Sequence, residues 1–133
     1  MKNRPMLTLD DCRKITAAAE AEAKKNNWNV CIAILDDGGH LLHLARMDGA
    51  TPANARIAVA KGRTAAESRR STAGWQERVK ARPEMLGMPG ITPIQGGVPI
   101  VVEGTCVGAV GISGVQSHED EQIAAAGIKA VTG

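Results

Sequence analysis

The chain has 133 residues, of which 44% are hydrophobic, and its 16 basic and 14 acidic residues give a net charge of +2. This length suits one domain with one core, and the near balance of charge, with no long block of either sign, argues against nucleic-acid binding. No apolar stretch approaches the roughly 18 residues of a membrane-spanning helix, and no apolar run of signal-peptide length opens the chain. We therefore expect a single cytoplasmic domain that binds neither nucleic acid nor membrane. The three cysteines, Cys12, Cys31 and Cys106, are widely spaced in apolar stretches, which favours reduced thiols over disulfides or a zinc site.

The first third of the chain predicts a helix followed by a β-hairpin. A capping box at Thr8 and Asp11 opens a helix whose apolar residues recur at helical spacing up to about Asn26. The apolar run Val30–Leu35 is typical of a strand that is covered on both faces. The turn sequence DDGG then leads into a second strand over His40–Met47.

The middle of the chain predicts a second helix and a long loop. Thr51-Pro52 has the chemistry of an N-cap and a first helical residue, and the helix is expected to run to Ser68 or Arg70. Further helical turns anchored by Trp75 are weakly indicated before residue 82. The segment Pro83–Gly97 contains four glycines and three prolines, and a connection of this length is often functional.

The last part of the chain predicts a second hairpin and a closing helix. The strands Val98–Val102 and Thr105–Ile112 flank a two-residue turn, and a capping box at Ser117 and Asp120 opens a helix to Val131. Since each pair of strands is joined too tightly for a crossover, the sheet is antiparallel. We predict an α/β chain of the α+β type, with helices on both faces of the sheet and a possible fifth strand between residues 85 and 95.

Four segments together resemble the GlcG/HbpS family, which also includes the carboxy-terminal domain of PduO-type proteins. They are the DDGG turn with its strand, ARMDGA at Ala45–Ala50, PIQGGVPIV at Pro93–Val101 and VGAVGISG at Val107–Gly114. The resemblance implies a profilin-like three-layer α/β/α sandwich around a five-stranded antiparallel sheet, in one domain over residues 1–133. It also implies a homo-oligomer, as dimers or up to an octamer, and binding of haem or a related tetrapyrrole.

Several residues are candidates for a ligand site. Arg46 and Asp48 precede the helix opened by Thr51-Pro52, where a guanidinium and free helix N–H groups suit an anion, although the two side chains could simply pair with each other. Lys61 lies beside the small-residue stripe of the second helix and could bind a carboxylate, or reach solvent. The remaining candidates lie in the long loop: Met85 and Met88 could line a cleft or fill a gap, and Gly96 and Gly97 could present N–H groups to an anion or simply shape the entry to a strand.

The histidines leave the haem ligand open. His40 and His43 lie three residues apart on one strand, so their side chains are expected to point to opposite faces and cannot easily share one metal ion. Either could ligate haem iron alone, or be an ordinary sheet histidine with a hydrogen-bond partner. Arg56, Arg63 and Arg70 recur every seven residues and, with no interleaved aromatic residues, favour a solvated helix face over a phosphate site.

Three functions remain open at this point. The first is an oligomeric protein that binds haem or another small molecule where the Pro83–Gly97 loop and the second helix meet a neighbouring subunit. The second is a cofactor-independent isomerase or lyase acting on a small carboxylate, with Arg46 as carboxylate clamp, Lys61 or His43 as proton carrier, and Gly96-Gly97 stabilising an enolate. The third is a non-catalytic accessory subunit.

Overall fold

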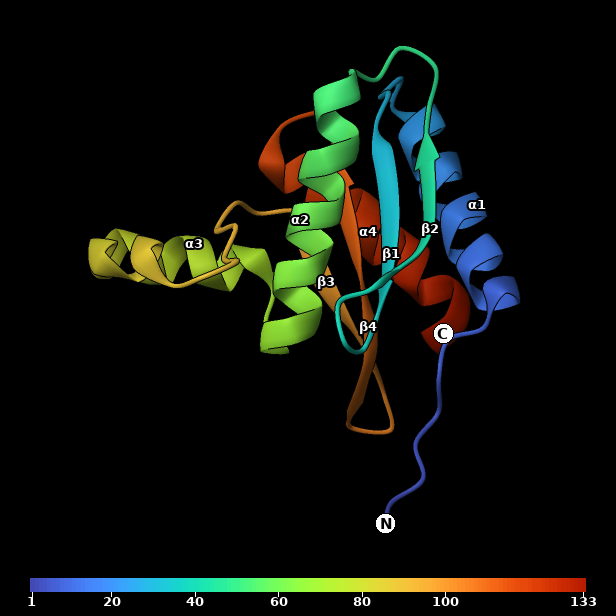
Figure 1. Cartoon of the computed structure of the whole chain (residues 1–133). Coiled ribbons are helices and arrows are strands. Elements are labelled where there is room, and N and C mark those ends of the chain that lie inside the picture. The colour runs from blue at the N-terminus through green and yellow to red at the C-terminus, as the bar shows by residue number, and fades with distance from the viewer.

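The structure, a computed structural model, describes all 133 residues as one four-stranded antiparallel sheet with helices on both faces. Figure 1 shows α1 and α4 against one face and α2 against the other. The elements in chain order are α1 Leu9–Lys25, β1 Cys31–Asp36, β2 Leu41–Arg46, α2 Pro52–Ser68, α3 Thr72–Ala81, the 3-10 turn η1 Pro83–Gly87, β3 Gly97–Val102, β4 Thr105–Ser113 and α4 Ser117–Thr132. No helix combines the length and apolar character that crossing a membrane requires.

The two hairpins pack side by side, so the strand order is β2-β1-β4-β3. The central strands β1 and β4 pair along their length, from Cys31 opposite Ser113 to Asp36 opposite Gly108. This places the unbroken apolar runs in the middle of the sheet, where both faces are covered, as their sequence predicted. The edge strands β2 and β3 are more exposed.

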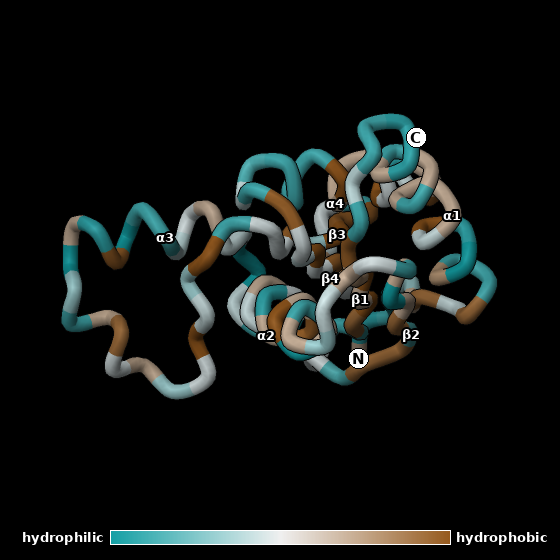
Figure 2. The backbone as a smooth tube through the Cα atoms, turned by 90° about the horizontal axis from the view of Figure 1, so that it is seen from above, coloured by the Kyte–Doolittle hydropathy of each residue, from teal (hydrophilic) through white to brown (hydrophobic).

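The sheet has four strands, so the expectation of a fifth strand between residues 85 and 95 is wrong. That segment contains η1 and an irregular return path that leaves the sheet, as Figure 2 shows. Prolines at 89 and 93 lack the N–H that a ladder needs, and the glycines between residues 87 and 96 resist extended regular structure.

Two apolar cores lie on the two faces of the sheet. The larger one joins α1 and α4 to the sheet through fully buried residues such as Ile15, Ile34 and Ile123. The smaller one, under α2, is built almost wholly from alanines with Cys31 and Leu35. Because alanines are short, α2 approaches the sheet closely. Burial raises the pKa of the Cys12 and Cys31 thiols, and all three cysteines are free.

The helix cap predicted from the sequence is confirmed for α1 and is wrong for α4. At α1, Thr8 Oγ1 accepts the Asp11 N–H at 3.1 Å and the Asp11 carboxylate accepts the Thr8 N–H at 2.9 Å, as predicted. At α4 the capping box is formed by Gln116 and Glu119, so the predicted pair of Ser117 and Asp120 is wrong. Asp120 points into the protein instead, where its carboxylate pairs with Lys61.

Candidate functional site

Lys61 lies inside the protein and pairs with Asp120. Its Nζ donates to Asp120 Oδ2 and to the carbonyl oxygen of Ile112, both at 3.0 Å, and only 2% of Lys61 and 1% of Asp120 are exposed. Burial raises the pKa of the Asp120 carboxyl, and the Lys61 ammonium and the Val115 N–H act against that rise. Because α2 and α4 cover opposite faces of the sheet, this buried pair ties the two helical layers together.

Gly96 and Gly97 make room for this lysine. A Cβ on Gly96 would lie 2.8 Å from Lys61 Nζ, and one on Gly97 would fall on the Lys61 carbonyl. The Gly97 N–H already donates to the hydroxyl of fully buried Thr72 at 2.8 Å. The two glycines therefore serve the close approach of α2 to β3, and the Gly97 N–H is not available to an anion.

The two histidines of the first hairpin differ in availability. His43 lies on the α1 face, where its Nδ1 is 3.2 Å from Thr16 Oγ1. His40 lies in the turn before β2, with 82% of its side chain exposed and its Nδ1 3.3 Å from Asp36 Oδ1. Its Nε2 has no protein partner, and a carboxylate that orients the second ring nitrogen is the usual support of a metal-ligating histidine. No group of three His, Cys, Asp or Glu residues could hold a metal ion.

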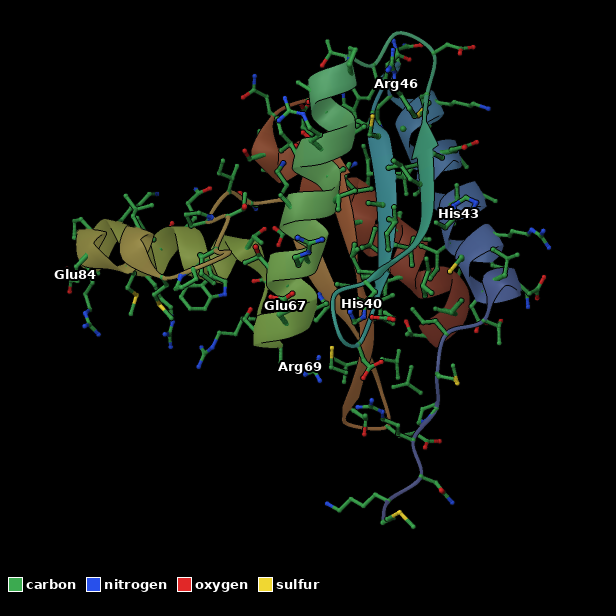
Figure 3. The ribbon with its side chains drawn as sticks, in the orientation of Figure 1. His40, His43, Arg46, Glu67, Arg69 and Glu84 are labelled. Atoms are coloured by element: carbon green, nitrogen blue, oxygen red, sulfur yellow. The ribbon has the colours of Figure 1, made fainter.

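Arg46 and Asp48 line a polar pocket of about 350 Å³ at the far end of β2 from His40, as Figure 3 shows for Arg46. The other lining residues are Glu20, Lys24, Asn29 and Met47. No ion pair joins Arg46 to Asp48, so the alternative of an internal pair is not seen. Thr51 is the N-cap of α2, and its side chain makes no cap bond. Neither Lys61 nor His43, the proposed proton carriers, lines this pocket.

An apolar groove opens between β2 and α2, and the sequence did not single it out. Its volume is about 290 Å³, and it is lined by Leu44 of β2 and by Ala55, Arg56, Val59, Ala60 and Arg63 of α2. Leu44 is 40% exposed, although it lies on the same face of the sheet as the alanine core. Arg63, at one end of the groove, lies beside the turn that precedes His40, because a Cβ on Gly39 would lie 3.2 Å from Arg63 Cγ. The seven-residue spacing of Arg56 and Arg63 was the one signal in the sequence.

Met85 and Met88 lie in and just after η1, in a part of the chain that projects from the sandwich (Figures 1 and 2). Met88 is 45% exposed and neighbouring Leu86 is 63% exposed. They line no pocket within the single chain. Any cavity that they border must therefore involve another molecule.

The Asp36 carboxylate beside His40 should make the stability of the fold depend on pH in the acid range. Burial alone would raise its pKa, but the N–H groups of His40 and Gly38, each donating at 2.9 Å, outweigh burial and lower the pKa below 3.8. Its contribution to stability is therefore present above about pH 3.8 and is lost as the pH falls through the lowered value. We expect Asp36→Asn to reduce the urea midpoint at about pH 6 more than at about pH 3. Asp48→Asn, at an exposed carboxyl with no ion-pair partner, is the control, and equal losses at both pH values would contradict the expectation.

The sequence of the chain is similar to a known family and to known proteins. A family model described as haem degrading protein HbpS-like matches residues 7–129. The chain belongs to the HbpS-like family. Protein GlcG from Escherichia coli (strain K12) is 48% identical over 114 residues, which are 85% of each chain. An uncharacterised 15.0 kDa protein of Citrobacter freundii, from a dhaT-dhaS intergenic region, is 31% identical over 123 residues, 89% of this HbpS-like chain and 87% of the relative.

Crystal structures of HbpS-like proteins share the fold. A double mutant of HbpS from Streptomyces reticuli superposes with a TM-score of 0.91 at 30% identity, over 98% of this chain and 90% of that one. A complex of PduOC with haem superposes with a TM-score of 0.87 at 25% identity, over 96% of both chains. The family resemblance predicted from the sequence motifs is thereby confirmed.

Proposed function

We propose that this HbpS-like chain binds haem or a related tetrapyrrole, as part of a homo-oligomer, in the groove between β2 and α2. The observation that carries the proposal is the apolar floor of that groove, Leu44, Ala55 and Val59, with an arginine at each of two positions along its α2 wall. A haem presents two apolar faces and two carboxylates, so one site must offer both kinds of contact. The haem complex of the similar PduOC supports the same ligand class.

The arginines supply the charge that the propionates need. Arg56 and Arg63 lie two helical turns apart on α2, and neither forms an ion pair within the chain. A guanidinium binds a carboxylate through two parallel hydrogen bonds. The arginine spacing therefore suits the two propionates of one haem edge better than it suits a neutral ligand.

His40 is the side chain that we assign to the iron. It adjoins the Arg63 end of the groove, its Nε2 is free, and Asp36 orients its Nδ1. Neutral imidazole is a common axial ligand of haem iron. When bound, the haem would supply the redox and ligand-binding chemistry of its iron, while this chain would orient the ring and shield one face. The three free thiols support a reducing compartment, the cytoplasm, as the location.

Titration with ferric haem tests the site. We expect saturable binding with a sharp Soret shift, and His40→Ala to change the Soret position and weaken binding about 10-fold or more, because the axial bond is lost. Arg56→Ala and Arg63→Ala should each weaken binding about 10-fold or more, since a hydrogen bond to a charged group contributes about 1.5–3 kcal/mol.

His118→Ala is the matched control, because His118 is exposed at the start of α4, away from the groove. It should leave the titration unchanged. Unsaturable adsorption that salt abolishes, or equal loss in His40→Ala and His118→Ala, would rule out the assigned site.

A further inference from the structure

Four charged side chains line the polar pocket of about 350 Å³ at the end of β2. Two of them, Lys24 and Arg46, are cationic, and two, Glu20 and Asp48, are anionic. None of the four forms an ion pair, with each other or with any other residue of the chain. Both signs of charge therefore face the same pocket and are free to bind a ligand.

The backbone around the pocket is held in place. Glu20 and Lys24 lie four residues apart on α1, so they point from one face of that helix. The Met47 N–H donates to the carbonyl oxygen of Val30 at 3.0 Å, and this bond joins the segment before β1 to the segment after β2. The Ala50 N–H donates to the carbonyl oxygen of Met47 at 3.1 Å and closes the turn that follows β2. The charged groups are thus presented from fixed segments, which lowers the cost of binding.

Asn29 also lines the pocket, and the turn after β2 fixes its position. A Cβ on Gly49 would lie 2.8 Å from Asn29 Nδ2, so the amide packs directly against the turn. Gly49 has a φ of +90°, which favours glycine at this position. The Asn29 amide offers a neutral donor and acceptor beside the four charges. Met47 is the one hydrophobic lining residue, so the pocket suits a polar ligand.

The balance of charge selects the kind of polar ligand. A simple anion would be attracted by the two cations but repelled by the two carboxylates, and a simple cation would meet the reverse. A molecule that carries both a carboxylate and an ammonium group finds partners for both. A guanidinium binds a carboxylate through two parallel hydrogen bonds, and an ammonium group has three N–H donors for carboxylate oxygens. The lining therefore fits a zwitterion better than an ion of either sign.

The pocket has the size of a site for a small metabolite, and it is separate from the β2–α2 groove. Small-molecule sites range from about 300 to 1,000 Å³, and this pocket lies near the lower end of that range. It shares no lining residue with the groove. Figure 3 shows Arg46 at the opposite end of β2 from His40. Binding in this pocket can therefore be tested independently of haem.

We propose that this pocket binds a free α-amino acid. Arg46 and Lys24 hold the carboxylate of the amino acid, and Glu20 and Asp48 hold its ammonium group. An α-amino acid carries both charged groups on one carbon atom, so one small molecule reaches partners of both signs at once. Lys24, Arg46 and Asp48 are exposed, so the ligand enters from solvent without an opening of the fold. The inference goes beyond the proposed function and does not rest on it.

Calorimetric titration with each of the standard amino acids tests the proposal. We expect saturable binding of at least one of them. For the one that binds best, the amine that lacks its carboxylate and the acid that lacks its ammonium group should each bind about 10-fold or more weakly, because each analogue loses a charged hydrogen-bonding group. Saturable binding of none of the amino acids would overturn the proposal, and so would an analogue with one charged group that binds as tightly as the amino acid.

Two variants locate the binding. Arg46→Gln and Asp48→Asn change exposed side chains, so both proteins should fold, and each should bind the amino acid about 10-fold or more weakly. In Arg46→Gln the advantage of the amino acid over its amine analogue should also shrink, because the carboxylate has lost its main partner. A general change in the charge of the protein would not produce this second effect.

Arg13→Gln is the matched control, because it removes the same charge at an exposed residue of α1 that forms no ion pair and lines no pocket. It should leave the titration with the amino acid unchanged. Equal loss of binding in Arg46→Gln and Arg13→Gln would show that the amino acid does not bind in this pocket. Haem binding, present or absent, does not alter any of these outcomes.

Discussion

Lys61→Met should destabilise the fold by about 3–5 kcal/mol, because it leaves the buried Asp120 carboxylate without its partner. The lysine and aspartate are 2% and 1% exposed, so water cannot replace the lost ammonium. The Lys61 ammonium acts to lower the pKa of Asp120, so its removal should raise that pKa further. A group whose folded pKa is raised favours folding below that pKa, so the loss in Lys61→Met should shrink as the pH falls.

Urea unfolding of four proteins measures this effect. The double variant Lys61→Met with Asp120→Asn should be closer to wild type than Lys61→Met is, since no unpaired charge remains and Asn can still accept the Val115 N–H. The matched control is Lys80→Met, which removes the exposed Lys80–Glu77 pair, with side chains 64% and 69% exposed. It should cost less than about 1 kcal/mol. Similar losses in Lys61→Met and Lys80→Met would show that burial of the pair contributes nothing.

Gly111→Ala should also reduce the stability of the fold, by about 1–3 kcal/mol or more, because the added methyl group overpacks the contact between α2 and the sheet. A Cβ on Gly111 would fall on the Ala58 carbonyl of α2 and lie 2.6 Å from the Gly62 nitrogen. Both are backbone atoms, so no side chain can rotate away and the helix itself must shift. Since α2 carries Arg56 and Arg63, the shift should also weaken haem binding.

Gly87→Ala is the control for this prediction, because a Cβ at Gly87 meets nothing within 4 Å. Thermal unfolding and the haem titration of both variants give the comparison. A Gly111→Ala protein as stable as Gly87→Ala would mean that α2 can move away from the sheet at little cost.

These buried contacts also fix the positions of the helices and strands whose exposed residues form the proposed haem site. The buried Lys61–Asp120 pair joins α2 to α4, and the Thr72–Gly97 bonds join the start of α3 to the start of β3. Loss of haem in Lys61→Met at a pH where the protein remains folded would be the expected signature of this coupling.

The sequence alone determined the elements and their packing class. Apolar runs such as Val30–Leu35, tight turns such as DDGG, and helical spacing after Thr8 are local signals, and the structure follows them with small changes in the ends. They also determined the family, because four glycine-containing motifs in a fixed order are far more specific than any one of them. The number of strands, four instead of the expected five, and the capping residues of α4 were predicted wrongly, since both depend on contacts between distant residues.

Only the tertiary structure decided which residues share a site. Lys61 read as a candidate ligand because a lysine beside small residues is ambiguous, and its partner Asp120 is 59 positions away. The β2–α2 groove brings Leu44 and Val59 together through the packing of α2 beside β2, which no periodicity encodes. The segment Pro83–Gly97 was recognisable as an unusual loop, but its path depends on the hydrogen bonds that Thr64 accepts from the Thr92 N–H and Gln76 accepts from the Gln95 N–H. Local propensity is written in neighbouring residues, whereas a binding surface is made by the packing of distant ones.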